Sequence, residues 1–160
     1  MSHQFLMSIS QQAQADELIE TFSLFDEWED RYRFLIDLGR ELPPFEDADK
    51  TDLNKVHGCQ SNVWIVADTR EENGVAVIDF VADSDAHIVR GLIAVLRRLY
   101  AGKTASEILS FDIEEFLKQL GLDQHLSTGR RNGLAGMVSR IKQTATESAS
   151  ASALPGVLQS

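Results

Sequence analysis

The 160-residue chain has 15 lysines and arginines against 25 aspartates and glutamates, which gives a formal net charge of −10, and 43% of its residues are hydrophobic. This length and composition predict one domain with a conventional hydrophobic core. The negative charge disfavours nucleic-acid binding, because it repels phosphate groups. It favours either encounter with a basic partner or simple solubility.

The sequence also bears on the cellular compartment. The single cysteine excludes an intramolecular disulfide, and "MSHQFLMSIS" lacks the basic and apolar regions of a secretory signal. The most apolar stretch, residues 87–101, is interrupted by three arginines and is too short to span a bilayer. We therefore expect a cytoplasmic protein without a membrane segment.

Two helices are predicted at the N-terminal end. The first covers residues 15–25, where apolar residues recur at helical spacing: Ala15, Leu18, Phe22 and Phe25. The second begins at Asp26, which can form a capping box with Glu29, and it ends at Gly39. Its expected buried residues are Trp28, Tyr32, Leu35, Ile36 and Leu38.

A β-hairpin follows. Residues 61–68 and 74–83 are rich in β-branched and aromatic side chains, and the polar stretch between them, "TREENG", ends in Asn73-Gly74, a frequent turn dipeptide. The preceding "NKVHG", residues 54–58, predicts a short third strand at one edge. We therefore expect a small antiparallel sheet of about three strands.

Helices are predicted again after the hairpin. A long helix is capped by one residue of Asp83-Ser84-Asp85 and ends near Gly102. Two short helices follow, and a last one begins at Arg130 or Arg131. The capping boxes of the short helices are Thr104 with Glu107 and Asp112 with Glu115, with Gly121 as the stop of the second. The apolar residues of the last helix are Leu134, Met137, Val138 and Ile141.

The end of the chain differs in composition. Residues 144–160 form a Ser/Ala-rich tract without an apolar stripe, which predicts a mobile tail. The expected domain therefore covers residues 1–143. Its element order, two helices, a small sheet and then several helices, predicts an α+β fold.

Cys59 lies in "HGCQSNVW", after a glycine that permits a tight turn and directly before the first predicted strand. Such a loop can present a thiol to solvent, and nearby cations can stabilise the thiolate that acts as a nucleophile. His57, Arg130 and Arg131 are the cationic candidates. A lone cysteine is also often a small buried hydrophobic residue, so both roles stay open at this point.

Other chemistry has weaker support in the sequence. The four histidines, His3, His57, His87 and His125, are scattered, and no metal-binding spacing occurs, so we expect no metal site and no cofactor. A Cys-His hydrolase or thiol transferase, with His125 or His87 as the base, remains an alternative. The other role for His125 is structural, at a corner between a helix and a loop.

The sequence "VHGCQSNVWIVAD" resembles the cysteine-centred signature of the SufE/CsdE family of sulfur-acceptor proteins. Three further blocks resemble the family in the same order: "WEDRYRFLIDLGRELPPF", "DSDAHIVRGLIAVL" and "QHLSTGRRNGLAGM". The resemblance implies an α+β fold related to the IscU-type scaffold proteins. It also implies a sulfur carrier, and not an enzyme, in iron–sulfur cluster assembly.

The resemblance implies roles for partners and residues too. Cys59 would accept persulfide sulfur from a pyridoxal-phosphate-dependent cysteine desulfurase of the SufS or CsdA type and pass it to a scaffold complex of the SufBCD type. The carrier would also stimulate the desulfurase. Residues with supporting roles would be Asp85 and Arg130, with Gly58, Gln60 and Ser61 in the partner-binding loop. His57 is a further supporting candidate because of its position two residues before Cys59, not because of the resemblance. The doubled arginine leaves Arg130 and Arg131 as alternatives, and the SufE and CsdE types are not distinguished.

Overall fold

The computed structural model describes residues 3–57 and 61–158. The two N-terminal helices are α1 (His3–Ser23) and α2 (Trp28–Gly39), followed by a short 3-10 helix, Asp47–Asp49. Strands β1 (Val63–Glu72) and β2 (Val75–Ser84) come next. The remaining helices are α3 (His87–Tyr100), α4 (Ala105–Ser110), α5 (Ile113–Gln119), α6 (Leu122–His125) and α7 (Thr128–Leu158). The predicted α+β class is confirmed.

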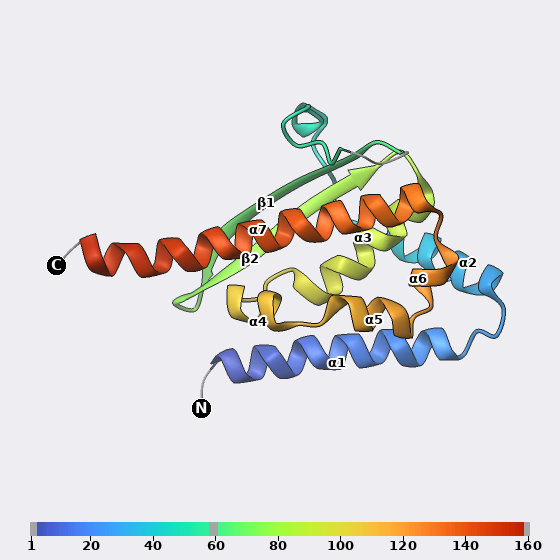
Figure 1. Cartoon of the computed structure of the whole chain (residues 1–160), viewed down its shortest axis with the longest axis horizontal. Coiled ribbons are helices and arrows are strands. Elements are labelled where there is room, and N and C mark those ends of the chain that lie inside the picture. Colours follow the sequence, from blue (N-terminus) through green and yellow to red (C-terminus); the bar gives the residue numbers. More distant parts are fainter. Residues whose placement is uncertain (1–2, 58–60, 159–160) are drawn as a thin grey trace.

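Helix α3 forms the centre of the core. Most of its residues are buried, and α1 lies on one side of it while the hairpin and α7 lie on the other (Figure 1). The predicted apolar faces supply the packing: Ala15, Leu18 and Phe22 of α1 are buried, and so are Leu134, Met137, Val138 and Ile141 of α7. Burying these side chains is the main favourable contribution to folding.

The two strands form the antiparallel hairpin that the sequence predicts. Val63 pairs with Ser84 at one end and Glu72 with Val75 at the other, and Asn73 and Gly74 both adopt positive φ in the turn between them. Positive φ at both positions is typical of the tight turns that match strand twist. The predicted third strand is wrong: of residues 54–58, the described residues 54–57 contribute one isolated bridge, Lys55 to Trp64, and Gly58 lies outside the described residues.

Two predicted helix starts are also wrong. Helix α2 begins after Glu27, whose side chain makes no capping bond, and not at Asp26. Helix α3 begins after Ala86, because β2 extends through Ser84 and keeps the preceding residues extended. By contrast, the capping box of Thr104 and Glu107 is present.

Helix α7 is longer at both ends than the sequence predicts. It begins at Thr128, where the hydroxyl of Ser127 accepts a hydrogen bond from the backbone N–H of Arg130. It continues as a helix to Leu158, and Ala145 is fully buried in the core. The core therefore extends beyond the predicted domain end at residue 143. The predicted mobility of the stretch from residue 144 stays a prediction.

Helices α2 and α3 pack closely through glycine. A Cβ atom at Gly91 of α3 would lie 2.2 Å from the carbonyl oxygen of Leu35 in α2. A Cβ at Gly39, the last residue of α2, would lie 2.8 Å from the backbone of Arg90 and Gly91. Only glycine fits at this crossing, because real Cβ atoms do not approach backbone atoms so closely.

Candidate functional site

The predicted acceptor Cys59, together with Gly58 and Gln60, lies outside the residues that the structure describes. The chain on both sides of it is described, and so are the other predicted site residues. The site is therefore defined by what holds these two flanks and by the groups around them.

The C-terminal flank is held by Asp85. Its carboxylate accepts hydrogen bonds from the backbone N–H of Asn62 at 3.1 Å and from the Asn62 side-chain amide at 2.8 Å. The backbone N–H of Asp85 donates to the Asn62 carbonyl at 3.4 Å. Asp85, which was predicted as a helix cap or a site residue, thus fixes the chain three residues after Cys59. Asn62 was not predicted as a functional residue, although it lies within the signature.

The N-terminal flank is held by β1 and α7. The backbone N–H of Val56 donates to the carbonyl of Val63 at 2.8 Å, and Ile65 N–H donates to the carbonyl of Asn54 at 2.9 Å. The guanidinium of Arg140, on α7, donates to the carbonyls of Leu53 at 3.2 Å and Lys55 at 2.9 Å. These bonds fix the chain up to Val56.

Helix α7 approaches this flank closely. Val56 is buried, and a Cβ atom at Gly136 of α7 would lie 2.5 Å from its Cγ1 atom. Gly136 therefore lets α7 pack directly on the residue that precedes His57. Neither Arg140 nor Gly136 was predicted as a site residue, because the sequence carries no signal for their contact with a segment so far away in the chain.

His57 and Ser61 lie next to the two fixed flanks. The His57 side chain is 64% exposed, and its Nε2 atom lies 3.9 Å from the exposed carboxylate of Asp52. Ser61 is half-buried. His57 thus adds a solvent-facing imidazole two residues before Cys59, with a carboxylate within ion-pair distance.

The two candidate arginines have different surroundings. Arg130 donates to the hydroxyl of Tyr32 in α2 at 2.8 Å, and its guanidinium carbon lies 6.0 Å from the centre of that ring. Arg131 donates instead to the carbonyl of Asp123 at 3.2 Å and to the hydroxyl of Thr128 at 3.5 Å. Arg130 belongs to the first turn of α7, at the same end of the molecule as the start of α3 (Figure 1).

The histidines do not form a cluster in the described part of the chain. His125, at the end of α6, stacks on Trp28 with ring centres 4.3 Å apart, which gives it a packing role at the corner after α6. Within residues 3–57 and 61–158 no three histidines, acidic residues or cysteines gather in a way that could hold a metal ion. In the same ranges, no helix is long and apolar enough to cross a bilayer.

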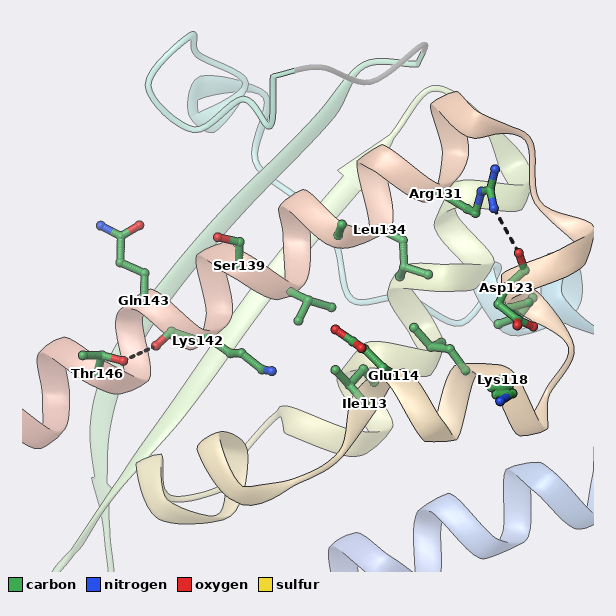
Figure 2. A pocket seen from close by; sticks show the side chains of 14 residues that line it. Ile113, Glu114, Lys118, Asp123, Arg131, Leu134, Ser139, Lys142, Gln143 and Thr146 are labelled. Atoms are coloured by element: carbon green, nitrogen blue, oxygen red, sulfur yellow. Dashed lines mark hydrogen bonds between the residues drawn. The ribbon is translucent and has the colours of Figure 1, made fainter.

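A hollow of about 950 Å³ lies elsewhere, between α5, α6 and α7 (Figure 2). Its wall includes Leu134 and Ile113, and charged residues such as Glu114, Arg131 and Lys142 stand around it. Asp85, Arg130 and His57 do not line it. Among the predicted site residues that the structure describes, only Arg131 lines this hollow. The two neighbouring arginines therefore face different parts of the surface.

Comparison with known proteins identifies the family. Residues 16–145 match the family model described as "SufE: Fe-S metabolism associated domain". An uncharacterized SufE-like protein of Rhizobium etli is 45% identical over 139 residues, which cover 87% of this chain and 94% of that protein. An uncharacterized SufE-like protein of Rhizobium meliloti is also 45% identical, over 81% of this chain and 93% of that protein.

A solved structure supports the fold. The solution structure of a hypothetical protein from Thermus thermophilus aligns with a TM-score of 0.67 and 21% identity, covering 86% of this chain and 96% of that one. The chain therefore has the fold of that protein and belongs to the SufE family. This membership associates it with iron–sulfur metabolism.

Proposed function

We propose that this protein is a sulfur acceptor and carrier that takes persulfide sulfur on Cys59 from a pyridoxal-phosphate-dependent cysteine desulfurase of the SufS or CsdA type. It stimulates that enzyme and delivers the sulfur to a scaffold complex of the SufBCD type. The observation that carries the proposal is the family match over residues 16–145, which includes the only cysteine of the chain. The protein acts as a carrier in the cytoplasm and needs no metal or cofactor of its own.

The transfer is a thiol exchange. The Cys59 thiolate attacks the terminal sulfur of the persulfide on the desulfurase, and a new S–S bond forms on Cys59. The S–S bond of the enzyme's persulfide breaks, and its electron pair stays on the enzyme's cysteine as a thiolate. Sulfane sulfur changes carrier without net oxidation, so no other oxidant or reductant takes part.

The described flanks support this role. Both sides of the three-residue stretch 58–60 are anchored by hydrogen bonds, at Val56 and at Asn62. Anchored flanks lower the entropy that is lost when a partner binds the segment between them. Arg130 is proposed as the cationic group that favours the thiolate, and Asp85 as the residue that positions the loop.

The test is intact-mass spectrometry of the protein after incubation with a cysteine desulfurase and free cysteine, without reductant. We expect a species heavier by one or more sulfur atoms, which disappears on reduction and does not form with Cys59→Ser. Desulfurase turnover should rise with the wild-type protein and not with the variant. An unmodified wild-type protein beside active desulfurases of both types would overturn the proposal.

A further inference from the structure

The segment that leads to the cysteine loop displays a large apolar side chain. Leu53 is 84% exposed, the highest value among the large hydrophobic residues whose side chains are described, followed by Leu24 at 76% and Leu109 at 43%. Single exposed leucines are common on protein surfaces, so exposure alone indicates no function. Three further observations distinguish Leu53.

First, the backbone around Leu53 is held in place. Its own carbonyl and that of Lys55 accept hydrogen bonds from Arg140. The side chain of Asn54 donates to the carbonyl of Asp49 at 2.9 Å, and the backbone N–H of Asn54 donates to the hydroxyl of Thr51 at 3.4 Å. Leu53 is thus fixed in an exposed position, and turning it inward would break these bonds.

Second, the segment stands out from the rest of the protein. Figure 1 shows residues 47–57, which include the short 3-10 helix, projecting beyond β1. A partner that approaches Cys59, two residues after His57, therefore meets this segment as well. An exposed apolar group at such a place can be buried on binding without rearrangement of the carrier.

Third, the segment is acidic on its exposed side. Residues 46–57 contain four carboxylates, Glu46, Asp47, Asp49 and Asp52, against the two lysines Lys50 and Lys55. The side chains of Asp47 and Asp52 are 96% and 91% exposed. The Lys50 ammonium lies between Asp47 at 3.4 Å and Asp83 at 3.6 Å, and 5.4 Å from the centre of the Trp64 ring, so Lys50 partly compensates Asp47. Asp52 has no lysine or arginine within ion-pair distance among the described residues.

We propose that residues 47–57 form a preformed docking surface, in which Leu53 enters an apolar pocket of the cysteine desulfurase while Asp52 faces a lysine or arginine side chain at the rim of that pocket. This proposal rests on the proposed function, because the partner is the enzyme that supplies sulfur to Cys59. An apolar anchor surrounded by charges is a common arrangement at interfaces, where the anchor contributes affinity and the charges contribute association rate and specificity.

The test separates docking from chemistry. Desulfurase turnover is measured against increasing concentration of the carrier, and binding of the carrier to the desulfurase is measured directly by calorimetry with Cys59→Ser as the background, so that no sulfur is transferred. We expect Leu53→Ala to weaken binding and to raise the half-maximal stimulating concentration by about tenfold. The maximal turnover and the circular dichroism spectrum should not change.

The controls are two other exposed leucines. Leu24→Ala and Leu109→Ala remove the same carbons from the surface at other elements, and both should bind like the parent protein. Asp52→Lys should weaken binding by reversing a rim charge, and added salt should weaken the parent more than this variant. Unchanged binding of Leu53→Ala, or equal weakening by Leu24→Ala, would overturn the docking proposal.

Failure of the proposed function gives a different result. In that case the wild-type protein neither gains sulfur on Cys59 nor binds the desulfurase, and both proposals are overturned. If the wild-type protein gains sulfur while Leu53→Ala binds as tightly as the parent, only the docking surface is overturned. Gain of sulfur with selective weakening by Leu53→Ala supports both.

Discussion

The carboxylate of Asp85 binds Asn62 through both of its oxygens, one to the backbone N–H and one to the side-chain amide. This pair joins the residue after β2 to the residue before β1. It holds the chain directly before β1, three residues after Cys59 in the sequence. We expect it to restrain the thiol and, through its negative charge, to disfavour the thiolate.

Asn62→Ala and Asp85→Asn should therefore make Cys59 more reactive. Asn62→Ala removes the side-chain bond, and Asp85→Asn also removes the charge, so the second should have the larger effect. Each should lower the free energy of unfolding by about 1 kcal/mol. The rate of iodoacetamide alkylation at Cys59 measures the change in reactivity, and urea denaturation measures the change in the free energy of unfolding. Asp68→Asn, a charge change within β1, is the control, and an equal rate increase there would contradict the prediction.

Arg130 and Arg131 should differ in function although they are neighbours. Arg130 is bonded to Tyr32, whereas Arg131 is bonded to the carbonyl of Asp123 beside the α5–α7 hollow. We expect Arg130→Met to slow sulfur gain at Cys59 by about tenfold, as expected for loss of a cation that stabilises a thiolate. Arg131→Met should leave the rate unchanged. Mass spectrometry over a time course gives both rates. Equal slowing by the two variants would mean that both arginines act only through the positive charge of the surface, which would contradict the prediction.

Tyr32→Phe tests how Arg130 is positioned. It removes only the hydroxyl that accepts the 2.8 Å bond and keeps the ring beneath the guanidinium. Sulfur gain should slow less than with Arg130→Met. A rate identical to that of the wild type would show that the hydroxyl does not contribute to Arg130 function.

The crossing of α2 and α3 should not tolerate alanine. A Cβ at Gly91 would lie 2.2 Å from the carbonyl oxygen of Leu35, and a rotamer change cannot relieve a clash with backbone. We expect Gly91→Ala to lower the free energy of unfolding by about 2–4 kcal/mol. Gly74→Ala, in the hairpin turn, meets no atom within 4 Å and carries only the strain of positive φ, about 1 kcal/mol. Urea denaturation of both variants shows which of them loses more free energy of unfolding. A larger loss with Gly74→Ala would contradict the prediction.

Tyr100 should make stability depend on pH in the alkaline range. Its hydroxyl is buried without a hydrogen-bond partner among the described residues, and burial raises the pKa of its phenol. The pKa of the phenol is thus higher in the folded state than in the unfolded state. The contribution of this pKa difference to the free energy of unfolding is therefore fully present below about pH 10 and is lost as pH rises further. Tyr100→Phe should lose less stability than the wild type between about pH 8 and pH 11.

The same variant has a second expected outcome at about pH 8, where the phenol is neutral in both states. Because the buried hydroxyl has no partner in the described part of the chain, Tyr100→Phe should be at least as stable as the wild type there. Urea denaturation at both pH values provides the comparison. Equal losses of stability in the two proteins at alkaline pH would contradict the proposed titration.

Local patterns in the sequence predicted most of the helices and the hairpin, whereas contacts between residues distant in the chain were not predictable. The hairpin follows from two β-branched runs around Asn73-Gly74, and the capping box from Thr104 and Glu107, residues close together in the chain. The contacts of Asp85 with Asn62 and of Arg130 with Tyr32 join residues 23 and 98 positions apart. Their existence depends on how the helices pack, which a single sequence does not reveal.

The errors at helix ends have a similar physical origin. Asp26 has the residue type of a cap but lies one position too early, and the side chain of Asp85 bonds to Asn62 and not to the start of α3. Residues 144–158 have no apolar stripe and still continue α7, because a helix already begun extends at little cost through alanine-containing sequence. Helix propensity, and not an amphipathic pattern, thus accounts for the continuation of α7 through residues 144–158.

The two anchors limit how far the backbone at Cys59 can lie from the rest of the protein. Cys59 is three residues from Val56, which is bonded to Val63, and three residues from Asn62, which is bonded to Asp85. Three fully extended residues span only about 10 Å, so the backbone of Cys59 cannot lie farther than that from either anchor while these bonds persist. Under the proposed function, this short reach leaves no room for a long swinging arm, and delivery of sulfur would require transport of the whole protein between donor and recipient. Each proposed transfer would then need a close contact of two protein surfaces.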